Sequence, residues 1–175
     1  QSLGLSAVMP LVSQYGPSKI TQDFKNLITI YPMARPLMLR QDHPGVSLLA
    51  LATTMSTSYE KLGKEWIQAE KAAFEAKTDK KGPFTVAAQV EIKLAPKKTE
   101  PPPKDGQAQA GAKQPEPPEG LKTYLVVFGN ADFAGNSFFN LFGNGDLFLN
   151  TTNFLARALE QITVLGAGKA QLLTL

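Results

Sequence analysis

Three runs of hydrophobic residues along the chain predict strands of a sheet. Val46–Thr54 is an almost unbroken apolar run that follows a His-Pro-Gly turn, as expected of a strand covered on both faces. Phe84–Ile92 and Thr123–Phe128 are short, rich in β-branched and aromatic residues, and bounded by turn signals. We expect these two to be neighbouring strands of one sheet, joined by a long insertion.

Apolar residues at helical spacing predict two helices. Ser58–Lys77 places Trp66 on an apolar stripe and charged residues on its other faces. Leu147–Glu160 carries a second apolar stripe that includes Phe148. Asp146 is the expected N-cap of this helix, because its carboxylate can accept the unpaired amides of the first turn.

The remaining elements follow from weaker signals. Leu5–Val12 and Pro36–Leu39 are predicted as strands, and Thr21–Leu27 as a short helical turn. Ile162–Leu165 is predicted as a last short strand after the second helix. Strand, loop, helix and strand in succession indicate an α/β fold with parallel pairing.

One stretch differs sharply in composition from the rest. Lys93–Gly120 holds 7 of the 13 prolines and no aromatic residue, so it buries too little apolar surface to offset the entropy of ordering it. We expect a disordered, proline-rich insertion at about 94–120 within a single α/β domain over residues 1–175. Its lysine, proline and glutamate content leaves a docking segment for a partner open.

Composition and charge exclude several functions. The chain has 18 Lys and Arg against 15 Asp and Glu, a formal charge of +3, and the basic residues form no stripe with interleaved aromatics, so we expect no nucleic-acid partner. With no cysteine, thiol catalysis, disulfides and cysteine-based metal sites are excluded. No stretch of 18 unbroken apolar residues occurs. The chain opens on Gln instead of Met, so we expect a fragment of a longer protein.

His43 is the only histidine, so any Ser-His-Asp triad must use it. It lies in the turn Arg40–Gly45, and no G-x-S-x-G motif accompanies it. We expect a surface-turn residue and no catalytic residue.

The segment after Phe128 offers the candidate ligand site. Asn130 and Asp132 follow a strand end, where α/β sheets bind ligands, and with Asn136 they form the candidate ligand-binding set. The segment matches no phosphate-binding motif and lacks calcium-loop spacing, so we expect neither a metal nor a cofactor. The alternative is that Asp132 caps a following helical turn.

Five phenylalanines lie close together in the C-terminal part of the chain: Phe133, Phe138, Phe139, Phe142 and Phe148. Their spacing around Gly and Asn favours pinning a long loop to the core over forming a cofactor site. Several exposed together would mark a protein interface.

Five blocks carry a resemblance to a known family: Gln14–Phe24, Tyr31–Leu37, Asp79–Ala88, Leu125–Asn136 and Gly143–Ala156. The last two resemble the C-terminal signature of the auxiliary, extracytoplasmic domain of uncharacterised ABC transport systems, a family that includes gliding-motility-associated ABC transporter auxiliary proteins. The other three fit in the same order, so the resemblance covers most of the chain outside the proline-rich stretch.

The resemblance implies a three-layer α/β sandwich with a mostly parallel sheet, of the class I glutamine-amidotransferase-like or flavodoxin-like kind. It also implies a non-enzymatic, periplasmic accessory domain, anchored to the membrane by segments outside this chain. Such a domain would bind a permease or other membrane subunit, or an exported polymer. Two alternatives stay open: a hydrolase with Asp132 as general base, helped by Asp146 or His43, and a sugar-binding module.

Overall fold

The computed structural model describes residues 8–62, 73–94 and 121–167 of the chain. Within these ranges lie eight strands, one short 3-10 helix and one α-helix. In chain order they are β1 (Leu11–Val12), β2 (Gln14–Tyr15), β3 (Thr29–Ile30), β4 (Val46–Thr53), β5 (Tyr59–Glu60), β6 (Lys80–Lys81), β7 (Thr85–Lys93), β8 (Lys122–Phe128), η1 (Asp132–Ala134) and α2 (Asn144–Ala167).

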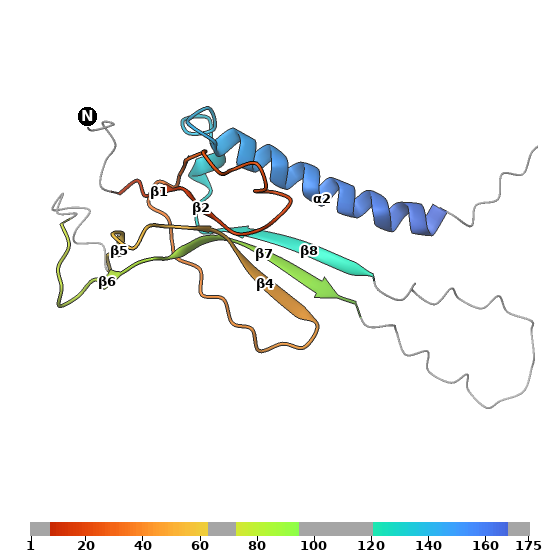
Figure 1. The fold of residues 1–175 in the computed structure, drawn as a ribbon, viewed down its shortest axis with the longest axis horizontal. Coiled ribbons are helices and arrows are strands. Elements are labelled where there is room, and N and C mark those ends of the chain that lie inside the picture. The colour runs from red at the N-terminus through yellow and green to blue at the C-terminus, as the bar shows by residue number, and fades with distance from the viewer. Residues whose placement is uncertain (1–7, 63–72, 95–120, 168–175) are drawn as a thin grey trace, which may run out of the picture.

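Four strands form a central sheet in the order β2-β4-β7-β8, and α2 lies along one side of it (Figure 1). All its pairings are antiparallel; Val90 of β7, for example, stands between Leu48 of β4 and Leu125 of β8. The two other pairs, β1 with β3 and β5 with β6, are also antiparallel. Those strands are only two residues long, so the central sheet is the main element of the fold.

The predicted three-layer α/β sandwich with a mostly parallel sheet is therefore wrong. The three long strands were located correctly, as β4, β7 and β8, and β7 and β8 are neighbours as expected. What a short apolar run does not reveal is the direction of its partner. Antiparallel neighbours need no helical crossover between them. β4 and β7, between which a helix was predicted, are such antiparallel neighbours.

That first predicted helix, Ser58–Lys77, is wrong at both described ends. Residues 59 and 60 form β5, and residues 73–77 are not helical. Its middle, residues 63–72 with Trp66, lies outside the described residues, as do residues 95–120 of the proline-rich stretch.

The strand predicted at Ile162–Leu165 is also wrong, because α2 continues to Ala167. β-branched residues suit strands, but extending an existing helix costs less than nucleating a new element. Leu147–Glu160, in contrast, is helical as predicted.

The N-terminal predictions were wrong in detail. The strand over Leu5–Val12 is reduced to β1 in its described part, and Pro36–Leu39 forms no strand, although the Leu37 amide donates to the Thr85 carbonyl at 2.8 Å. Thr21–Leu27 forms successive turns instead of a helix. A proline at residue 36 removes a donor that a central strand would need.

The hydrophobic core lies between the sheet and α2. Because side chains alternate along a strand, Tyr124, Val126 and Phe128 of β8 share the face toward α2, and Tyr124 meets Phe154 edge-on with ring centroids 5.0 Å apart. The buried members of the core are Val12, Ile20, Phe24, Tyr31, Leu51, Ala52, Val86, Ala87, Phe133 and Leu147.

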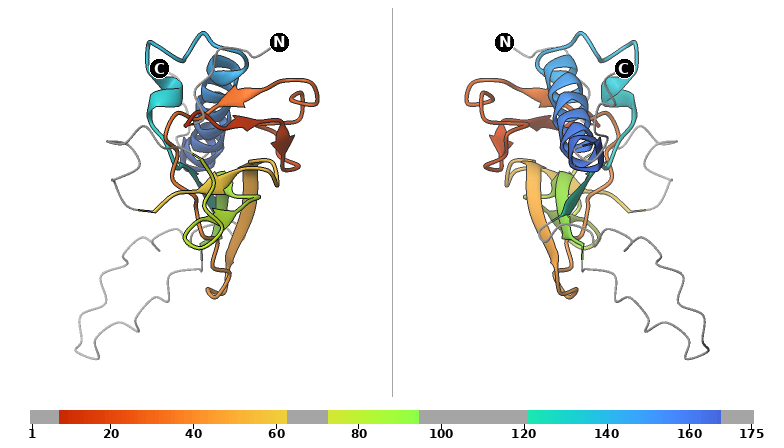
Figure 2. Two further views of the ribbon diagram at one scale, coloured as in Figure 1. Left: turned by 90° about the vertical axis from the view of Figure 1, so that its left-hand side faces the viewer. Right: turned by 90° about the vertical axis from the view of Figure 1, so that its right-hand side faces the viewer.

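The N-terminal segments pack beside α2 on the same side of the sheet (Figure 2). Gly16, which follows β2, lies close beside β4, and its amide donates to the Leu51 carbonyl at 3.0 Å. A Cβ at this position would collide with the Ala50 carbonyl oxygen, so only glycine permits this close approach.

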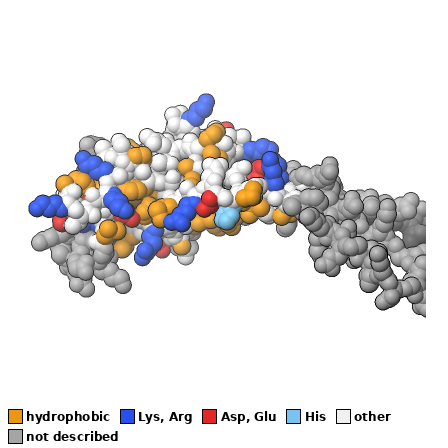
Figure 3. All heavy atoms as spheres, turned by 90° about the horizontal axis from the view of Figure 1, so that it is seen from below, with side chains coloured by type: hydrophobic (Ala, Val, Ile, Leu, Met, Phe, Trp, Pro, Cys, Tyr) orange, Lys and Arg blue, Asp and Glu red, His pale blue; other side chains and the backbone are white. Residues whose placement is uncertain are grey.

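The opposite face of the sheet is apolar as well. Antiparallel sheets with one solvated face usually place polar residues there. Here the register puts one polar residue, Thr123, among eight apolar ones on the three long strands: Val46, Leu48, Ala50, Ala88, Val90, Ile92, Leu125 and Val127. Figure 3 shows hydrophobic side chains gathered along this face, where the side chain of Leu125 is 53% exposed.

Candidate functional site

The turn that follows β8 holds the predicted ligand-binding residues, but Asn130 is already used by the fold. Its Nδ2 donates to the Pro32 carbonyl at 2.6 Å, and its Oδ1 accepts the Phe133 amide at 2.8 Å. Asp132 and Asn136 are exposed. The Asn130 amide thus makes structural hydrogen bonds, whereas Asp132 and Asn136 face solvent.

The alternative that Asp132 caps the following turn is wrong. Asp132 is the first residue of η1, and the residue before it, Ala131, provides no side-chain cap. Asn130 serves instead, through the bond to the Phe133 amide. This bond directs Phe133 into the core, where its ring lies 4.5 Å from that of Phe128 and 5.5 Å from that of Tyr31.

Asn144 is the other structural amide of this region, and its side chain is fully buried. Oδ1 accepts the Ile30 amide at 2.8 Å, while Nδ2 donates to the Ile30 and Phe133 carbonyls, both at 3.1 Å. A buried polar group is stable only when its hydrogen bonds are made, and here three are. Asn144 thus joins β3, η1 and the start of α2.

Asp146 is not the N-cap that the sequence predicted. α2 begins at Asn144, so Asp146 is the third residue of its first turn, and it is exposed. The Gly-Asn-Gly-Asp sequence contains two residues of types that cap helices, Asn144 and Asp146. Nothing in the local sequence shows that Asn144 hydrogen-bonds to Ile30. Asp146 still carries its charge near the positive end of the helix dipole.

Around the start of α2, large apolar side chains face solvent. Leu141 is 39% exposed, Phe142 48%, Phe148 41% and Leu149 51%. Phe148 also meets the half-buried Phe139 edge-on, with ring centroids 6.0 Å apart. We call these five residues the α2-start surface.

Phe142 is held in an unusual backbone conformation. Its φ is +50°, a region in which a non-glycine residue costs about 1–2 kcal/mol. The next residue fixes it: the Gly143 amide donates to the Ile28 carbonyl at 2.8 Å, and Gly143 is buried against Leu27. The fold therefore maintains a strained backbone that presents a large aromatic side chain to solvent.

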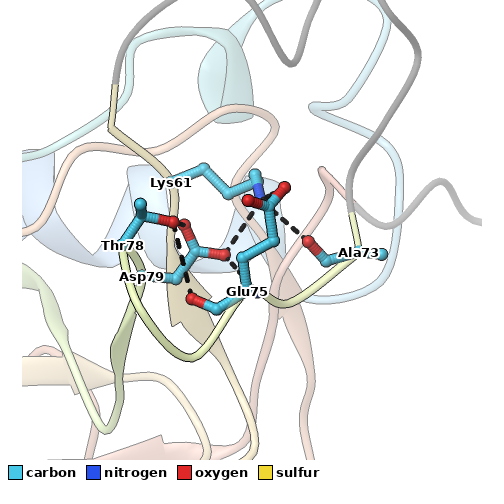
Figure 4. Close-up of polar contacts among 5 residues, drawn as sticks. All are labelled: Lys61, Ala73, Glu75, Thr78 and Asp79. Carbon is cyan, nitrogen blue, oxygen red and sulfur yellow. Dashed lines mark hydrogen bonds and ion pairs between the residues drawn. The ribbon is translucent and has the colours of Figure 1, made fainter.

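The densest group of polar contacts lies elsewhere, at the junction of β5 and β6 (Figure 4). Lys61 Nζ donates to Asp79 Oδ2 at 2.9 Å and to the Ala73 carbonyl at 2.8 Å, and lies 3.4 Å from Glu75 Oε1. Asp79 also accepts the Glu75 amide at 2.7 Å. The Lys61 and Asp79 side chains are only 9% and 2% exposed.

The charges of this cluster are fixed and unsuited to proton transfer. The hydrogen bond to Asp79 raises the pKa of Lys61 above its usual value, and the same bond lowers the pKa of Asp79 below its usual value. A general acid or base needs a pKa close to the working pH, and both shifts move the pKa farther from neutral pH. Lys61 and Asp79 therefore tie the chain together at this junction.

A second ion pair, on the sheet, has the same character. Lys122 Nζ lies 2.8 Å from Glu91 Oε1. The hydrogen bond between them lowers the pKa of Glu91 and raises that of Lys122. Burial, and to a smaller extent the nearby Glu91 charge, raises the pKa of Tyr124. These groups stay in their ordinary charge states at neutral pH.

His43 lies in an exposed surface turn, as predicted; its side chain is 79% exposed and its Nε2 lies 3.7 Å from Asp42 Oδ1. It lies three residues before Val46 of β4. Val46 pairs with Ile92 of β7, and Ile92 pairs with Thr123 at the beginning of β8. Asp132 follows the other end of β8. The five steps along the strand from Thr123 to Phe128 separate these ends by about 17 Å, so His43 cannot assist Asp132.

Across the described ranges, acidic and histidine side chains nowhere gather in the groups of three that a metal ion needs. The one α-helix found there lacks the run of apolar residues required to cross a membrane. Compared with known proteins, the sequence matches no family model, and no curated protein or solved structure is similar to it.

Sequence reasoning missed two of these features. Asn144 was treated as part of a turn, and the Lys61–Asp79 pair was not considered. The sequence held no signal for either, since their partners lie 114 and 18 residues away. The favoured role of the phenylalanines, to pin a loop to the core, fits the buried Phe133, whereas Phe142 and Phe148 are exposed, the case in which the sequence predicts a protein interface.

Proposed function

We propose that this chain is a non-enzymatic accessory domain that acts by binding a partner protein through the α2-start surface. The observation that carries the proposal is the exposure of Leu141, Phe142, Phe148 and Leu149 at one end of one helix. Exposed apolar groups that are clustered, in contrast to scattered ones, mark interaction sites. Aromatic side chains in particular are enriched among the residues that dominate binding energy.

The surface is also preorganised. Gly143 is bound to Ile28 and Asn144 to Ile30 and Phe133, so the backbone that follows Phe142 is fixed by the core. A partner that binds a rigid surface loses little conformational entropy in ordering it. The strain at Phe142 is consistent with this role, because backbone strain concentrates at functional sites.

We further propose that the partner is a membrane subunit of an ABC transporter, and that the domain works on the extracytoplasmic side of the membrane. The support is the resemblance of Leu125–Asn136 and Gly143–Ala156 to auxiliary domains of such systems. The second block contains Phe148 and Leu149, two of the five residues of the α2-start surface. The fold that the resemblance implied is not the one observed, so this part of the proposal rests on the sequence blocks alone.

The test is an affinity capture from solubilised membranes of the source organism, with the 175-residue chain as bait. We expect a transporter permease to be enriched together with its ATPase by the wild type, and to be lost with Phe142→Ser/Phe148→Ser. The matched control is Met38→Ser/Leu39→Ser, which removes two exposed apolar side chains remote from α2 and should capture normally. Equal capture by both variants, or capture of no transporter subunit, would contradict the proposal.

A further inference from the structure

The outer edge of β8 carries unpaired backbone groups. The Gly129 amide donates to Val86 and the Leu94 amide to Leu121, so the odd-numbered residues of β8 direct their amides and carbonyls toward β7. The even-numbered residues, Lys122, Tyr124, Val126 and Phe128, direct theirs away from the sheet. Among the residues that the structure describes, no backbone group pairs with these four.

This edge lacks the features by which natural sheets prevent pairing. Apart from Lys122 at its beginning, β8 has no charged residue and no proline, and the pairing of β7 with β8 contains no bulge. The opposite edge, β2, is only two residues long and is followed by Gly16 and Pro17. β2 covers only Ala52 and Thr53 at one end of β4, whereas the outer edge of β8 is open over the whole strand, Lys122–Phe128, and able to accept a strand.

We propose that the chain forms a two-fold symmetric dimer in which β8 pairs antiparallel with β8 of a second copy. The β8 strand is self-complementary: with Leu125 opposite Leu125, Lys122 meets Phe128 and Tyr124 meets Val126. This register is the one that pairs all four outward-pointing residues. A shift of one residue in the position of the axis leaves one of them without a partner.

The side chains fit the same register. Each Lys122 lies at an end of the paired strands and is already bound to Glu91, so the two lysines do not face each other. The two Leu125 side chains, each 53% exposed in the single chain, meet at the axis on the face away from α2. Val127, 37% exposed, meets Thr123 of the second copy. Pairing with an unrelated peptide does not require β8 to be self-complementary, whereas pairing with a second copy does. We therefore favour a second copy as the occupant.

The dimer does not involve the α2-start surface, so it can be tested separately from the proposed function. Light scattering on the 175-residue chain should give twice the mass of one chain, with dissociation on dilution. The register can then be read by cysteine substitution, because the chain has no cysteine of its own. Residues directly opposite in such a pair have Cα atoms about 4.5 Å apart, within the range of a disulfide.

Leu125→Cys should therefore cross-link to itself on oxidation. Thr123→Cys and Val127→Cys should not, because each is about 14 Å from its own copy, but a mixture of these two variants should cross-link. A single-chain mass at every concentration would overturn the dimer. Self-cross-linking of Thr123→Cys as readily as Leu125→Cys would overturn this register and the pairing argued from it.

Discussion

The side-chain amide of Asn144 pairs with the backbone of Ile30, 114 residues earlier, as another strand would: it accepts from the amide at 2.8 Å and donates to the carbonyl at 3.1 Å. This contact fixes the first residue of α2 against the end of β3. The position of the helix, and with it the α2-start surface, depends on one buried amide.

Replacement of Asn144 by Ala should therefore be among the most damaging single changes. It leaves the amide and carbonyl of Ile30 and the carbonyl of Phe133 buried without this partner, at about 1–3 kcal/mol for each unsatisfied group. We expect a loss of about 3 kcal/mol in the free energy of unfolding, measured by urea denaturation. Asn153→Ala, an exposed position on the same helix, is the control and should change stability by less than about 0.5 kcal/mol. Similar effects at both positions would contradict the role of Asn144.

The sequence predicted the parts of this region but not their connections. The helix, the strand before it and the phenylalanines were recognised from spacing, which is a local property. Which of two neighbouring polar residues starts α2 depends on Ile30, and which phenylalanines are buried depends on Asn130 and Asn144. Contacts over more than a hundred residues leave no periodic trace in a single sequence.

Asp146 acts through its charge and not through a capping hydrogen bond. Asp146→Ala and Asp146→Asn should thus cost equally, about 0.3–1 kcal/mol at low salt, because both remove a negative charge from the first helical turn. High salt should shrink both effects in the same urea titrations. Full stability in Asp146→Asn, with a clear loss only in Asp146→Ala, would restore the capping role.

Tyr31 carries a hydroxyl that is buried without a hydrogen-bond partner. Thr29 lies near enough to influence it, but burial dominates and raises the pKa of Tyr31 far above its ordinary value. Since an unsatisfied buried hydroxyl is unfavourable, Tyr31→Phe should leave stability unchanged or raise it by up to about 1 kcal/mol.

Tyr15 supplies the matched control for that substitution. Its hydroxyl donates to the Val12 carbonyl and pairs with the Thr29 hydroxyl, both at 2.9 Å. Tyr15→Phe should therefore cost about 1–2 kcal/mol. Equal losses in the two variants would show that the Tyr31 hydroxyl has a partner.

The Lys61–Asp79 pair should make stability depend on pH. Because the pKa of Asp79 is lowered in the folded state, its contribution is full above the ordinary aspartate value of about 3.9 and is lost as the pH falls toward the lowered value. The raised pKa of Lys61 keeps the pair intact up to the ordinary lysine value of about 10.4. Asp79→Asn should lower the midpoint of urea unfolding between these limits and have little effect at more acidic pH.

Glu75→Gln is the control for this pair, since Glu75 lies farther from Lys61 and its side chain is 62% exposed. Its effect should be much smaller at every pH. A difference between wild type and Asp79→Asn that persists unchanged into strong acid would mean that the Asp79 charge is not what stabilises the junction.

The fold class could not have been predicted from the same signals. The sequence located β4, β7 and β8, but a run such as Val46–Thr54 suits a parallel strand buried on both faces as well as an antiparallel one whose second face is also apolar. The parallel prediction came from the succession strand, loop, helix, strand, and its last strand, Ile162–Leu165, is part of α2. The central sheet is antiparallel, with one face under α2 and a second face that is also apolar.

If the α2-start surface meets a partner protein, a photo-cross-linker placed there captures that partner, which is the most direct test. A photoreactive phenylalanine analogue at position 142 of the protein in its source cells should give one dominant product, in which a transporter membrane subunit is identified by mass spectrometry. The same analogue at Met38, which is 82% exposed, should give no such product. No product at position 142, or the same products from both positions, would contradict the account.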